Sequence, residues 1–294
     1  MSIVNMKGIY KKFGKFTALN NVNLELSEGE IFGFIGPNGA GKTTTLRILM
    51  GIIKASEGNA KIFGKDVWSD AVELHKRIAY VPGDVNLWSN LTGGEVIDLL
   101  VRLRKNGTKK YKEELIERFA FDPSKKCRTY SKGNKQKVAL VAAFASDADL
   151  YILDEPTSGL DPLMEKVFRE CVGEVKAKGK TVLLSSHILS EVEQLCDKVG
   201  IIRRGKIIET GTMEELRHLT RTEVKVITKS PLTELKDNAA IHDLKEDGGK
   251  TTFAIDANDM ASVMNIIASK EIINLECAPP TLEELFMSHY EEGR

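Results

Sequence analysis

Residues 36–44 of the chain read Gly36-Pro37-Asn38-Gly39-Ala40-Gly41-Lys42-Thr43-Thr44 and fit the pattern G-x-x-x-x-G-K-[ST] of a phosphate-binding loop. Directly before the loop, residues 30–35 (E-I-F-G-F-I) read as a short buried strand. Directly after it, apolar residues recur at helical spacing, at Leu46, Leu49, Met50 and Ile53. This predicted order of strand, glycine turn and helix is the context in which such a loop binds phosphate.

The residue types of the loop suit contact with phosphate groups. Gly36, Gly39 and Gly41 allow backbone conformations closed to other residues and bring N–H groups close to an anion. The positive end of the following helix favours the same charge. Lys42 would reach the β- and γ-phosphates, and the Thr43 hydroxyl would be a magnesium ligand. We therefore predict that the chain binds a nucleotide.

Two carboxylates follow a second apolar run. Residues 150–153 read as a buried strand, and Asp154 and Glu155 stand at its C-terminal end, where ligands bind in open α/β sheets. Asp154 suits the magnesium ion that bridges the phosphates, and Glu155 suits the positioning and polarising of an attacking water. The alternative, acidic residues at an ordinary strand end, is disfavoured by the phosphate-binding loop in the same chain.

Three further features are ambiguous when each is taken alone. Phe13 can stack on adenine because every base offers a π-face, but such an aromatic is more often a hairpin core residue. His187, after the strand at 181–184, can donate to the γ-phosphate or the attacking water, or be an ordinary surface residue or a hydrogen-bonded core residue. The polar turn at 130–137 opens a helix, which suits an anion or is simply a helix start.

Composition places the chain among ordinary globular proteins. Its 294 residues, 42% hydrophobic and 29% charged, suffice for one large domain and a smaller one. No run of 18 apolar residues or signal-peptide core is present, so we expect any membrane role to come through a partner. The four cysteines lack C-x-x-C spacing, which is typical of free thiols in a reducing cytosol.

Charge is balanced overall, with 42 basic and 42 acidic residues, but it is uneven along the chain. Residues 220–294 contain 8 basic and 14 acidic side chains, a net of −6, which leaves +6 for residues 1–219. An excess of this size is typical of solvated surface. We therefore do not expect nucleic-acid binding.

The rest of the chain predicts an α/β core with additions. Residues 3–26 read as two strands around a turn, and residues 91–105 and 111–121 have helical spacing. Beyond about residue 220 the expected order is βαββαβ, with a helix at 231–237, which predicts a small ferredoxin-like domain. A last helix is expected from Thr281, with a capping box.

Taken in order, these motifs resemble those of the ATP-binding subunits of ABC transporters over residues 3–219. By this resemblance the chain contains the adenine-stacking aromatic Phe13, Walker A at 36–44, the signature Ser131-Lys132-Gly133-Asn134, Walker B at 150–155, the D-loop Ser158-Gly159-Leu160-Asp161 and the switch histidine His187. The resemblance implies an ABC ATPase of the P-loop NTPase fold with an antiparallel β subdomain and an α-helical subdomain at about 84–145. It assigns residues 1–219 to this nucleotide-binding domain and residues 220–294 to an accessory α+β domain.

The resemblance also implies the roles of individual residues. Glu155, His187 and Lys42 would be catalytic, and Thr43 and Asp154 would bind Mg²⁺. The residues expected to contact ATP are Phe13, Gly36, Asn38, Gly39, Gly41, Lys42, Thr43, Thr44, Ser131, Gly133, Asn134 and Asp161.

The family mechanism needs two copies, or this chain and a relative. The two subunits would sandwich two ATP molecules, each held between the Walker A of one subunit and the signature of the other. Hydrolysis would remove the contacts of the γ-phosphate and open the dimer. An integral membrane permease, docked near the helical region and Gly83, would hold the pair at the cytoplasmic face of the cell membrane.

Two departures from the family pattern stand out. Gly83 occupies the place of the usual glutamine after Tyr-x-Pro, and Asp84 or a water could substitute for it. The usual L-S-G-G-Q signature reads Tyr130-Ser131-Lys132-Gly133-Asn134. This spelling, the acidic C-terminal part and residues 280–286 are similar to exporter-type subunits of antibiotic, multidrug or sodium efflux.

Two alternatives to an exporter subunit remain open. A non-transport ABC ATPase acting on nucleic acid or in assembly is one, although ribosome-acting relatives usually have two phosphate-binding loops and this chain has one. A weakly hydrolysing regulatory subunit is the other, suggested by Gly83 and opposed by the intact Glu155 and His187. A GTPase is disfavoured because no Asn-Lys-x-Asp motif is present.

Overall fold

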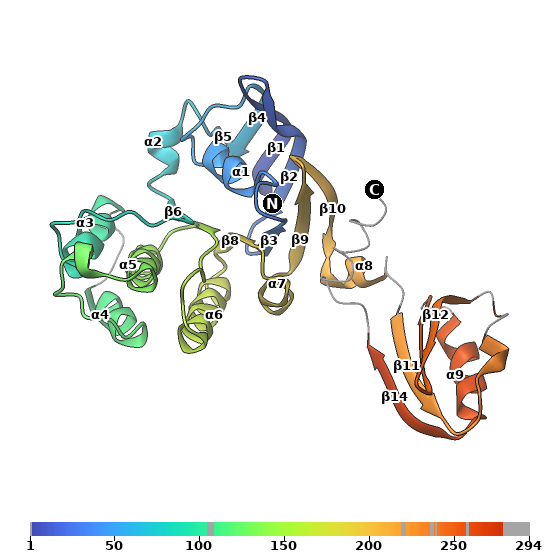
Figure 1. Cartoon of the computed structure of the whole chain (residues 1–294). Helices are drawn as coiled ribbons and strands as arrows, with labels where there is room; N and C mark the ends of the chain where they lie inside the picture. The colour runs from blue at the N-terminus through green and yellow to red at the C-terminus, as the bar shows by residue number, and fades with distance from the viewer. Residues whose placement is uncertain are drawn as a thin grey trace. The chain divides into compact units, whose positions relative to one another are not determined.

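A central sheet of six strands, ordered β10-β9-β3-β8-β7-β6, organises the computed structural model (Figure 1). The structure describes residues 2–104, 109–218, 222–235, 238, 240–256 and 259–278. The strands are β3 (Ile31–Ile35), β6 (Ile78–Val81), β7 (Leu150–Asp154), β8 (Thr181–Ser186), β9 (Lys198–Arg203) and β10 (Lys206–Thr212). From β9 to β6 the neighbours are parallel. Every residue of β3, β7 and β8 is buried, which explains the continuous apolar runs of β3 and β7.

The parallel register places three strand ends at one edge of this sheet. Ile35 of β3 pairs with Ser186 of β8, and Asp154 of β7 pairs with Ser185 of β8. The phosphate-binding loop follows Ile35, so it begins at the edge where Asp154 and Glu155 emerge. This is the edge at which open α/β sheets bind ligands.

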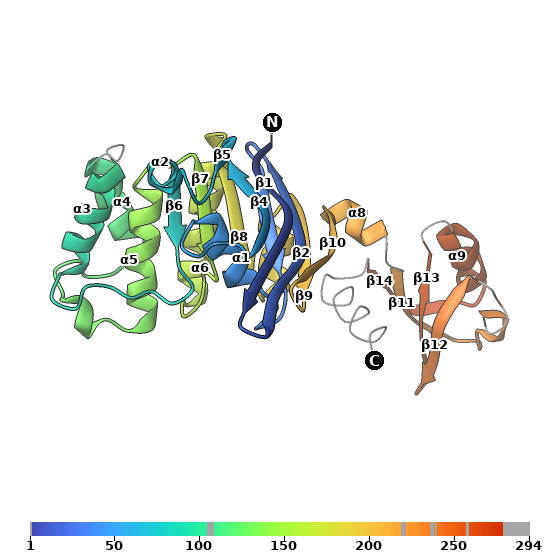
Figure 2. The same ribbon diagram turned by 90° about the horizontal axis from the view of Figure 1, so that it is seen from above.

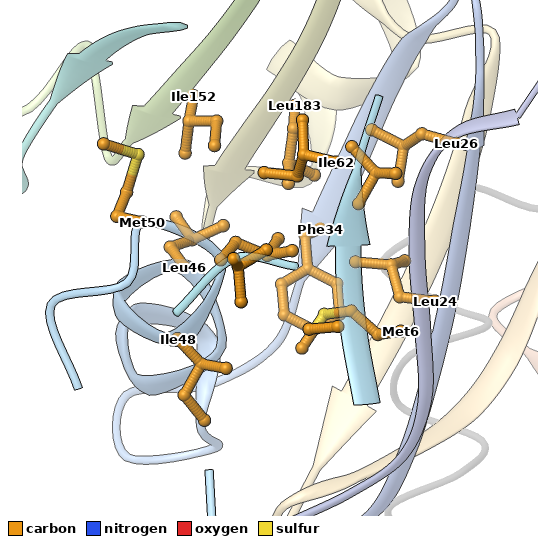
Figure 3. Packing of buried hydrophobic residues seen from close by; sticks show 14 of the residues in the cluster. Met6, Leu24, Leu26, Phe34, Leu46, Ile48, Met50, Ile62, Ile152 and Leu183 are labelled. Carbon is orange, nitrogen blue, oxygen red and sulfur yellow. The ribbon is translucent and has the colours of Figure 1, made fainter. Parts of the chain in front are cut away.

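A second sheet, ordered β2-β1-β4-β5, is antiparallel. Its strands are β1 (Ser2–Phe13), β2 (Phe16–Ser27), β4 (Glu57–Ile62) and β5 (Lys65–Asp66). Helix α1 (Lys42–Leu49) contacts both sheets, through β2 and β4 of this one and β7 of the central one. Figure 3 shows the resulting core, in which Met6 and Leu24 of the second sheet surround Phe34 of β3 beside Leu46 of α1. The core fixes α1 behind the phosphate-binding loop.

The helical region packs beside β6. Its helices are α3 (Gly93–Arg104), α4 (Lys109–Arg118), the 3-10 turn η1 (Cys127–Thr129) and α5 (Lys132–Phe144). Both α3 and α4 pack on α5, and α5 contacts β6, as Figure 2 shows. Helices α3 and α4 correspond to the two predicted at 91–105 and 111–121. The remaining helices of the first unit are α2 (Ala71–Leu74), α6 (Pro162–Ala177) and α7 (Leu189–Leu195).

The chain divides into two compact units, Met1–Thr210 and Gly211–Arg294. The division predicted from the sequence lies at 219, whereas the observed division places α8 (Met213–His218) in the second unit. This unit also contains β11 (Thr222–Thr228), η2 (Thr233–Leu235), β12 (Ile241–Asp247), β13 (Lys250–Ile255), α9 (Met260–Ala268) and β14 (Ile272–Ala278). Its antiparallel sheet, ordered β12-β13-β11-β14, has the strand order of a ferredoxin-like fold.

One element of the second unit differs from the prediction. Of the helix expected at 231–237, the described residues 231–235 contain the 3-10 turn η2, whose Leu235 is buried in the same core as Val263 and Ile267 of α9. Residues 236 and 237 lie outside the described residues. Pro231 has no backbone N–H to donate, which suits the non-helical start of the segment. The helix predicted from Thr281 lies outside the described residues.

Candidate functional site

The loop between β3 and α1 needs its glycines for two different reasons. Gly39 and Gly41 have φ angles of 79° and 115°, in the left-handed region where a side chain is unfavourable. Gly36 has no space for one, because a Cβ there would lie 2.3 Å from the carbonyl oxygen of Ile202. The loop backbone can therefore curve closely around an anion at the N-terminus of α1.

Lys42, the first residue of α1, is 5% exposed and is held by oxygen atoms. Its Nζ donates to the carbonyl oxygens of Gly36 at 2.6 Å and Pro37 at 3.3 Å. The same ammonium lies 3.3 Å from Oε1 of Glu155. The predicted phosphate-binding lysine and the predicted catalytic glutamate are thus in direct contact.

Glu155 follows β7 with a φ of 48°, an unusual conformation for a residue with a side chain. Its N–H is held by Ser185, through the carbonyl oxygen and the hydroxyl, both at 3.1 Å. Its Oε2 lies 2.5 Å from Nδ1 of His187. Glu155 therefore bridges Lys42 and the predicted switch histidine, and the left-handed turn is the kind of local strain found at functional sites.

Asp154 is 1% exposed, at the end of β7. Its Oδ1 accepts a hydrogen bond of 2.6 Å from the hydroxyl of Ser185. Ser185 therefore orients both acidic residues, a role that the sequence analysis did not assign to it. The available signal was a polar residue inside a strand whose six residues are all buried.

Two cavities flank this cluster. The first cavity, of about 290 Å³, is lined by Phe16, Ala18, Pro37, Asn38, Gly39, Gly41, Lys42, Thr43, Thr44 and Glu155. The second cavity, of about 400 Å³, is lined by Asn38, Thr43, Arg47, Tyr80, Pro82, Gly83, Asp84, Asp154, Glu155, Ser158 and His187. Asn38, Thr43 and Glu155 border both. The structure thus brings together the loop, both carboxylates and His187 around adjoining spaces.

Phe13, the predicted adenine-stacking residue, does not line either cavity, and its contact with nucleotide stays a prediction. Phe16, and not Phe13, lines the first cavity. The two rings come from paired positions at the end of the β1–β2 hairpin, and Phe13 packs under the ammonium of Lys11, which lies 4.8 Å from its ring centre. The sequence predicts an aromatic residue at the end of the hairpin. Which of the two rings faces the first cavity depends on the path of the turn between β1 and β2.

Gly83 lies against Asp154 in the wall of the second cavity. A Cβ at Gly83 would lie 3.4 Å from Cγ of Asp154, so a side chain there would touch the carboxylate. Tyr80, from β6, lines the same cavity, and burial, together with the charge of Asp154, raises the pKa of its hydroxyl to about 12. Its phenol therefore stays protonated at neutral pH.

The signature residues pack on the D-loop of the same chain. Ser131 caps α5 by accepting from the N–H of Asn134 at 3.3 Å. Lys132 Nζ donates to the Ser158 hydroxyl at 2.7 Å, and a Cβ at Gly133 would lie 2.4 Å from the carbonyl oxygen of Gly159. The D-loop then ends at Asp161, which caps α6 by accepting from the N–H of Met164 at 3.0 Å.

Of these signature and D-loop residues, Ser158 lines the second cavity, and the predicted nucleotide contacts among them line neither cavity. Ser131, Gly133, Asn134 and Asp161 are absent from the described lining of both. Of the whole predicted set of nucleotide contacts, the structure therefore collects the Walker A residues around Lys42 and leaves the signature elsewhere on the same chain. Their contact with nucleotide stays a prediction.

Comparison with known proteins identifies the family. The family model "ABC transporter" matches residues 19–158, and the model "ATP-binding protein DrrA1-3-like, C-terminal domain" matches residues 211–290. The ABC transporter ATP-binding protein NatA of Bacillus subtilis is 36% identical over 70% of this chain and 86% of its own length. The chain belongs to the ATP-binding subunits of ABC transporters. The family resemblance in the sequence is thereby confirmed.

Further relatives agree with this membership. The bacitracin transport ATP-binding protein BcrA of Bacillus licheniformis is 36% identical over 75% of this ABC subunit and 73% of its own length. An uncharacterized ABC transporter ATP-binding protein of Nostoc, all4389, is 37% identical over 69% of the subunit. The match spans 62% of the length of that relative.

Solved structures confirm the predicted fold class. An ATP-binding subunit of an ABC transporter matches 74% of the ABC subunit and 92% of its own chain, with a TM-score of 0.69 and 32% identity. The dimeric ATP-binding cassette MJ0796, in a post-hydrolysis state with ADP and Pi, matches 72% of the subunit and 99% of its own chain, with a TM-score of 0.66 and 26% identity. Among the described residues, no helix is long and apolar enough to span a membrane.

Proposed function

We propose that this ABC subunit binds ATP with Mg²⁺, pairs with a second ATPase subunit, and hydrolyses the nucleotide to drive export through a separate membrane permease. The observation that carries this proposal is the position of Glu155 between Lys42 and His187, beside the buried Asp154. A phosphate-binding cation, a carboxylate and an imidazole at one sheet edge are the groups that phosphoryl transfer to water requires.

Magnesium fits the groups that this chain offers. Thr43 and Asp154 line the second cavity and provide hydroxyl and carboxylate oxygens, which this hard cation prefers. In the described part of the chain no cluster of three or more His, Cys, Asp or Glu could hold a metal. A site with one carboxylate and one hydroxyl matches the way Mg²⁺ binds through substrate phosphates. When bound there, the ion would neutralise charge on the phosphate oxygens.

The chain's own residues divide the chemistry between them. Lys42 would hold the β- and γ-phosphates, which compete with Glu155 for its ammonium. Glu155 would then position and polarise the attacking water. His187, whose ring reaches Glu155, would donate to the γ-phosphate or to that water.

Pairing of two subunits would complete each site. Ser131 and Gly133 line neither cavity of their own chain, which supports a role toward the nucleotide of an opposing subunit. The dimeric form of the MJ0796 cassette supports this arrangement. We propose that Ser131, Gly133, Asn134 and Asp161 contact the nucleotide of the opposite subunit.

Similarity to BcrA and NatA supports the exporter assignment. BcrA is named as a bacitracin transport protein, and the C-terminal family model, DrrA1-3-like, extends over residues 211–290. The permease would hold the subunit at the cytoplasmic face of the cell membrane. Gly83 favours one alternative, a regulatory subunit that hydrolyses ATP weakly, because the chain lacks a side chain beside Asp154 at that position.

Phosphate release from ATP by the purified chain tests the proposal. The expected result is hydrolysis that requires Mg²⁺ and is stimulated in membranes that contain the permease. Binding of Mg-ATP without turnover in both conditions would favour the regulatory alternative. Lack of ATP binding would contradict the proposal altogether.

A further inference from the structure

Glu191 is a buried acidic residue that the proposed chemistry does not use. It lies in the first turn of α7 and is 8% exposed. Its Oε2 accepts hydrogen bonds from the hydroxyls of Thr157, at 3.1 Å, and Ser186, at 3.2 Å. Its Oε1 is buried and has no hydrogen-bond partner among the described residues. A buried polar atom without a partner is rare in proteins and calls for a functional or structural reason.

The two hydroxyls belong to the two segments that hold the catalytic pair. Thr157 lies two residues after Glu155, in the turn closed by a 3.1 Å hydrogen bond from Ser158 N–H to the carbonyl oxygen of Glu155. Ser186 directly precedes His187, and its hydroxyl accepts a 2.9 Å hydrogen bond from the N–H of Ile188. Through these two hydrogen bonds, Glu191 connects the segment that contains Glu155 to the segment that contains His187.

The turn held by Glu191 is also held by the signature helix. Gln136 of α5 is buried and donates from Nε2 to the carbonyl oxygen of Pro156 at 2.8 Å. Residues 156–158 are thus hydrogen-bonded both to Gln136 of α5 and to Glu191 of α7. A shift of this turn would pass to His187 through the carboxyl group of Glu191.

The surroundings of Glu191 do not favour a charged carboxylate. Burial raises the pKa of Glu191, against the hydrogen bonds from Thr157 and Ser186, which lower it. Glu165 on α6 raises it further and Arg169 on the same helix lowers it, while the thiol of Cys196 is also close enough to interact. No lysine or arginine forms a salt bridge with Glu191 among the described residues. Glu191 is therefore held in place by hydrogen bonds from the hydroxyls of Thr157 and Ser186.

We propose that Glu191 is a positioning residue that fixes the turn at residues 155–158 to the strand end before His187, and so keeps the side chains of Glu155 and His187 at the distance that hydrolysis requires. This role rests on the ATP hydrolysis proposed above, so turnover by the wild type is measured first. A wild type without turnover would refute the proposed ATP hydrolysis. With an active wild type, changes in the kcat of Glu191 variants test the role of Glu191.

Steady-state hydrolysis by the full chain tests this role through Glu191→Met, which keeps the length but removes both acceptors. We expect kcat to fall by roughly tenfold to a hundredfold, as displaced catalytic groups do, with KM for ATP changed less than about threefold. Two effects on the unfolding temperature oppose each other: the oxygen without a partner is gone, but the buried hydroxyls of Thr157 and Ser186 lose their acceptor, so we expect a smaller relative change in stability than in kcat. Glu191→Gln keeps an oxygen for the two hydroxyls and should restore most of kcat.

Three further variants separate positioning from simple structural support. Thr157→Val should lower kcat on its own. The double variant with Glu191→Met should have a kcat close to that of Glu191→Met alone, since both changes remove the hydrogen bond between Thr157 and Glu191. Gln194→Met, an exposed change on the same helix, should leave kcat unchanged. Unchanged kcat in Glu191→Met, or fully additive losses with Thr157→Val, would overturn the proposal. If Glu191→Met does not fold, full activity of Thr157→Val with Ser186→Ala would overturn it instead.

Discussion

Oε2 of Glu155 lies 2.5 Å from Nδ1 of His187, across the ends of two neighbouring parallel strands. The other oxygen of the same carboxylate lies 3.3 Å from Nζ of Lys42. One carboxylate thus links the residue expected to bind phosphate to the residue expected to act on it. An anion that attracts Lys42 weakens its attraction for Glu155, so arrival of the γ-phosphate would leave Glu155 available to water.

Glu155→Gln should reduce Mg²⁺-dependent ATP hydrolysis by about two orders of magnitude or more, because the amide cannot polarise water as a carboxylate does. Binding of ATP should persist, since Lys42 and the loop are untouched. Phosphate release under single turnover measures the effect, and Glu57→Gln, an exposed change on β4, is the matched control. An unchanged rate in Glu155→Gln would refute the assigned role.

Phe16→Ala should raise the KM for ATP more than Phe13→Ala does. Phe16 lines the first cavity, whereas Phe13 packs under Lys11. Loss of a stacked aromatic weakens base binding by about 1–3 kcal/mol, so KM should rise at least roughly fivefold in the first variant. A larger effect of Phe13→Ala would instead restore the assignment that the family resemblance implies.

Gly133→Ala should impair hydrolysis, whereas Gly173→Ala should not. The new Cβ at Gly133 would meet the carbonyl oxygen of Gly159 at 2.4 Å and force the signature and the D-loop apart, while Gly173 in α6 has nothing within 4 Å. We expect turnover of Gly133→Ala to fall by about tenfold or more. Gly173→Ala should be more stable by about 0.5–1 kcal/mol, because alanine suits a helix interior better. Kinetics and thermal unfolding of the pair measure both effects, and equal activities would contradict the packing described.

Gly83→Gln should change coupling to the permease more than ATP affinity. A Cβ at this position would lie 3.4 Å from Cγ of Asp154, which is close to an ordinary van der Waals contact. The cavity therefore accepts a side chain here with a small adjustment. ATP affinity by calorimetry and stimulation of hydrolysis by permease-containing membranes are the two readouts. Similar changes in both would argue that Gly83 belongs to the nucleotide site alone.

Local sequence was enough to predict the parts of the site that lie within one segment. The loop from Gly36 to Thr44 and the carboxylates after β7 follow directly from a buried strand and the residues at its end, and the parallel register brings them to one edge. The roles of Ser185 and Glu191 were not predicted. Their partners are distant in sequence or across a turn, so no periodicity indicates them.

Two other differences have the same origin. Phe16 lines the first cavity and Phe13 does not, and the described residues 231–235 contain the 3-10 turn η2, whose Leu235 packs in one core with Val263 and Ile267 of α9. Both outcomes are decided by tertiary packing, which overrides local propensity. The predicted α/β core, helical region and C-terminal strands depended on longer patterns and are present.

Disulfide cross-linking between subunits tests the central claim, that two subunits complete each other's sites. The chain would have Asn38→Cys in Walker A and Ser131→Cys in the signature, with Glu155→Gln to retain ATP and Cys277→Ser to remove the exposed thiol, the other three cysteines being buried. Our account predicts a cross-linked dimer that forms on oxidation with Mg-ATP and is lost when either new cysteine is omitted. Only monomer with ATP, or the same amount of dimer without ATP, would contradict it.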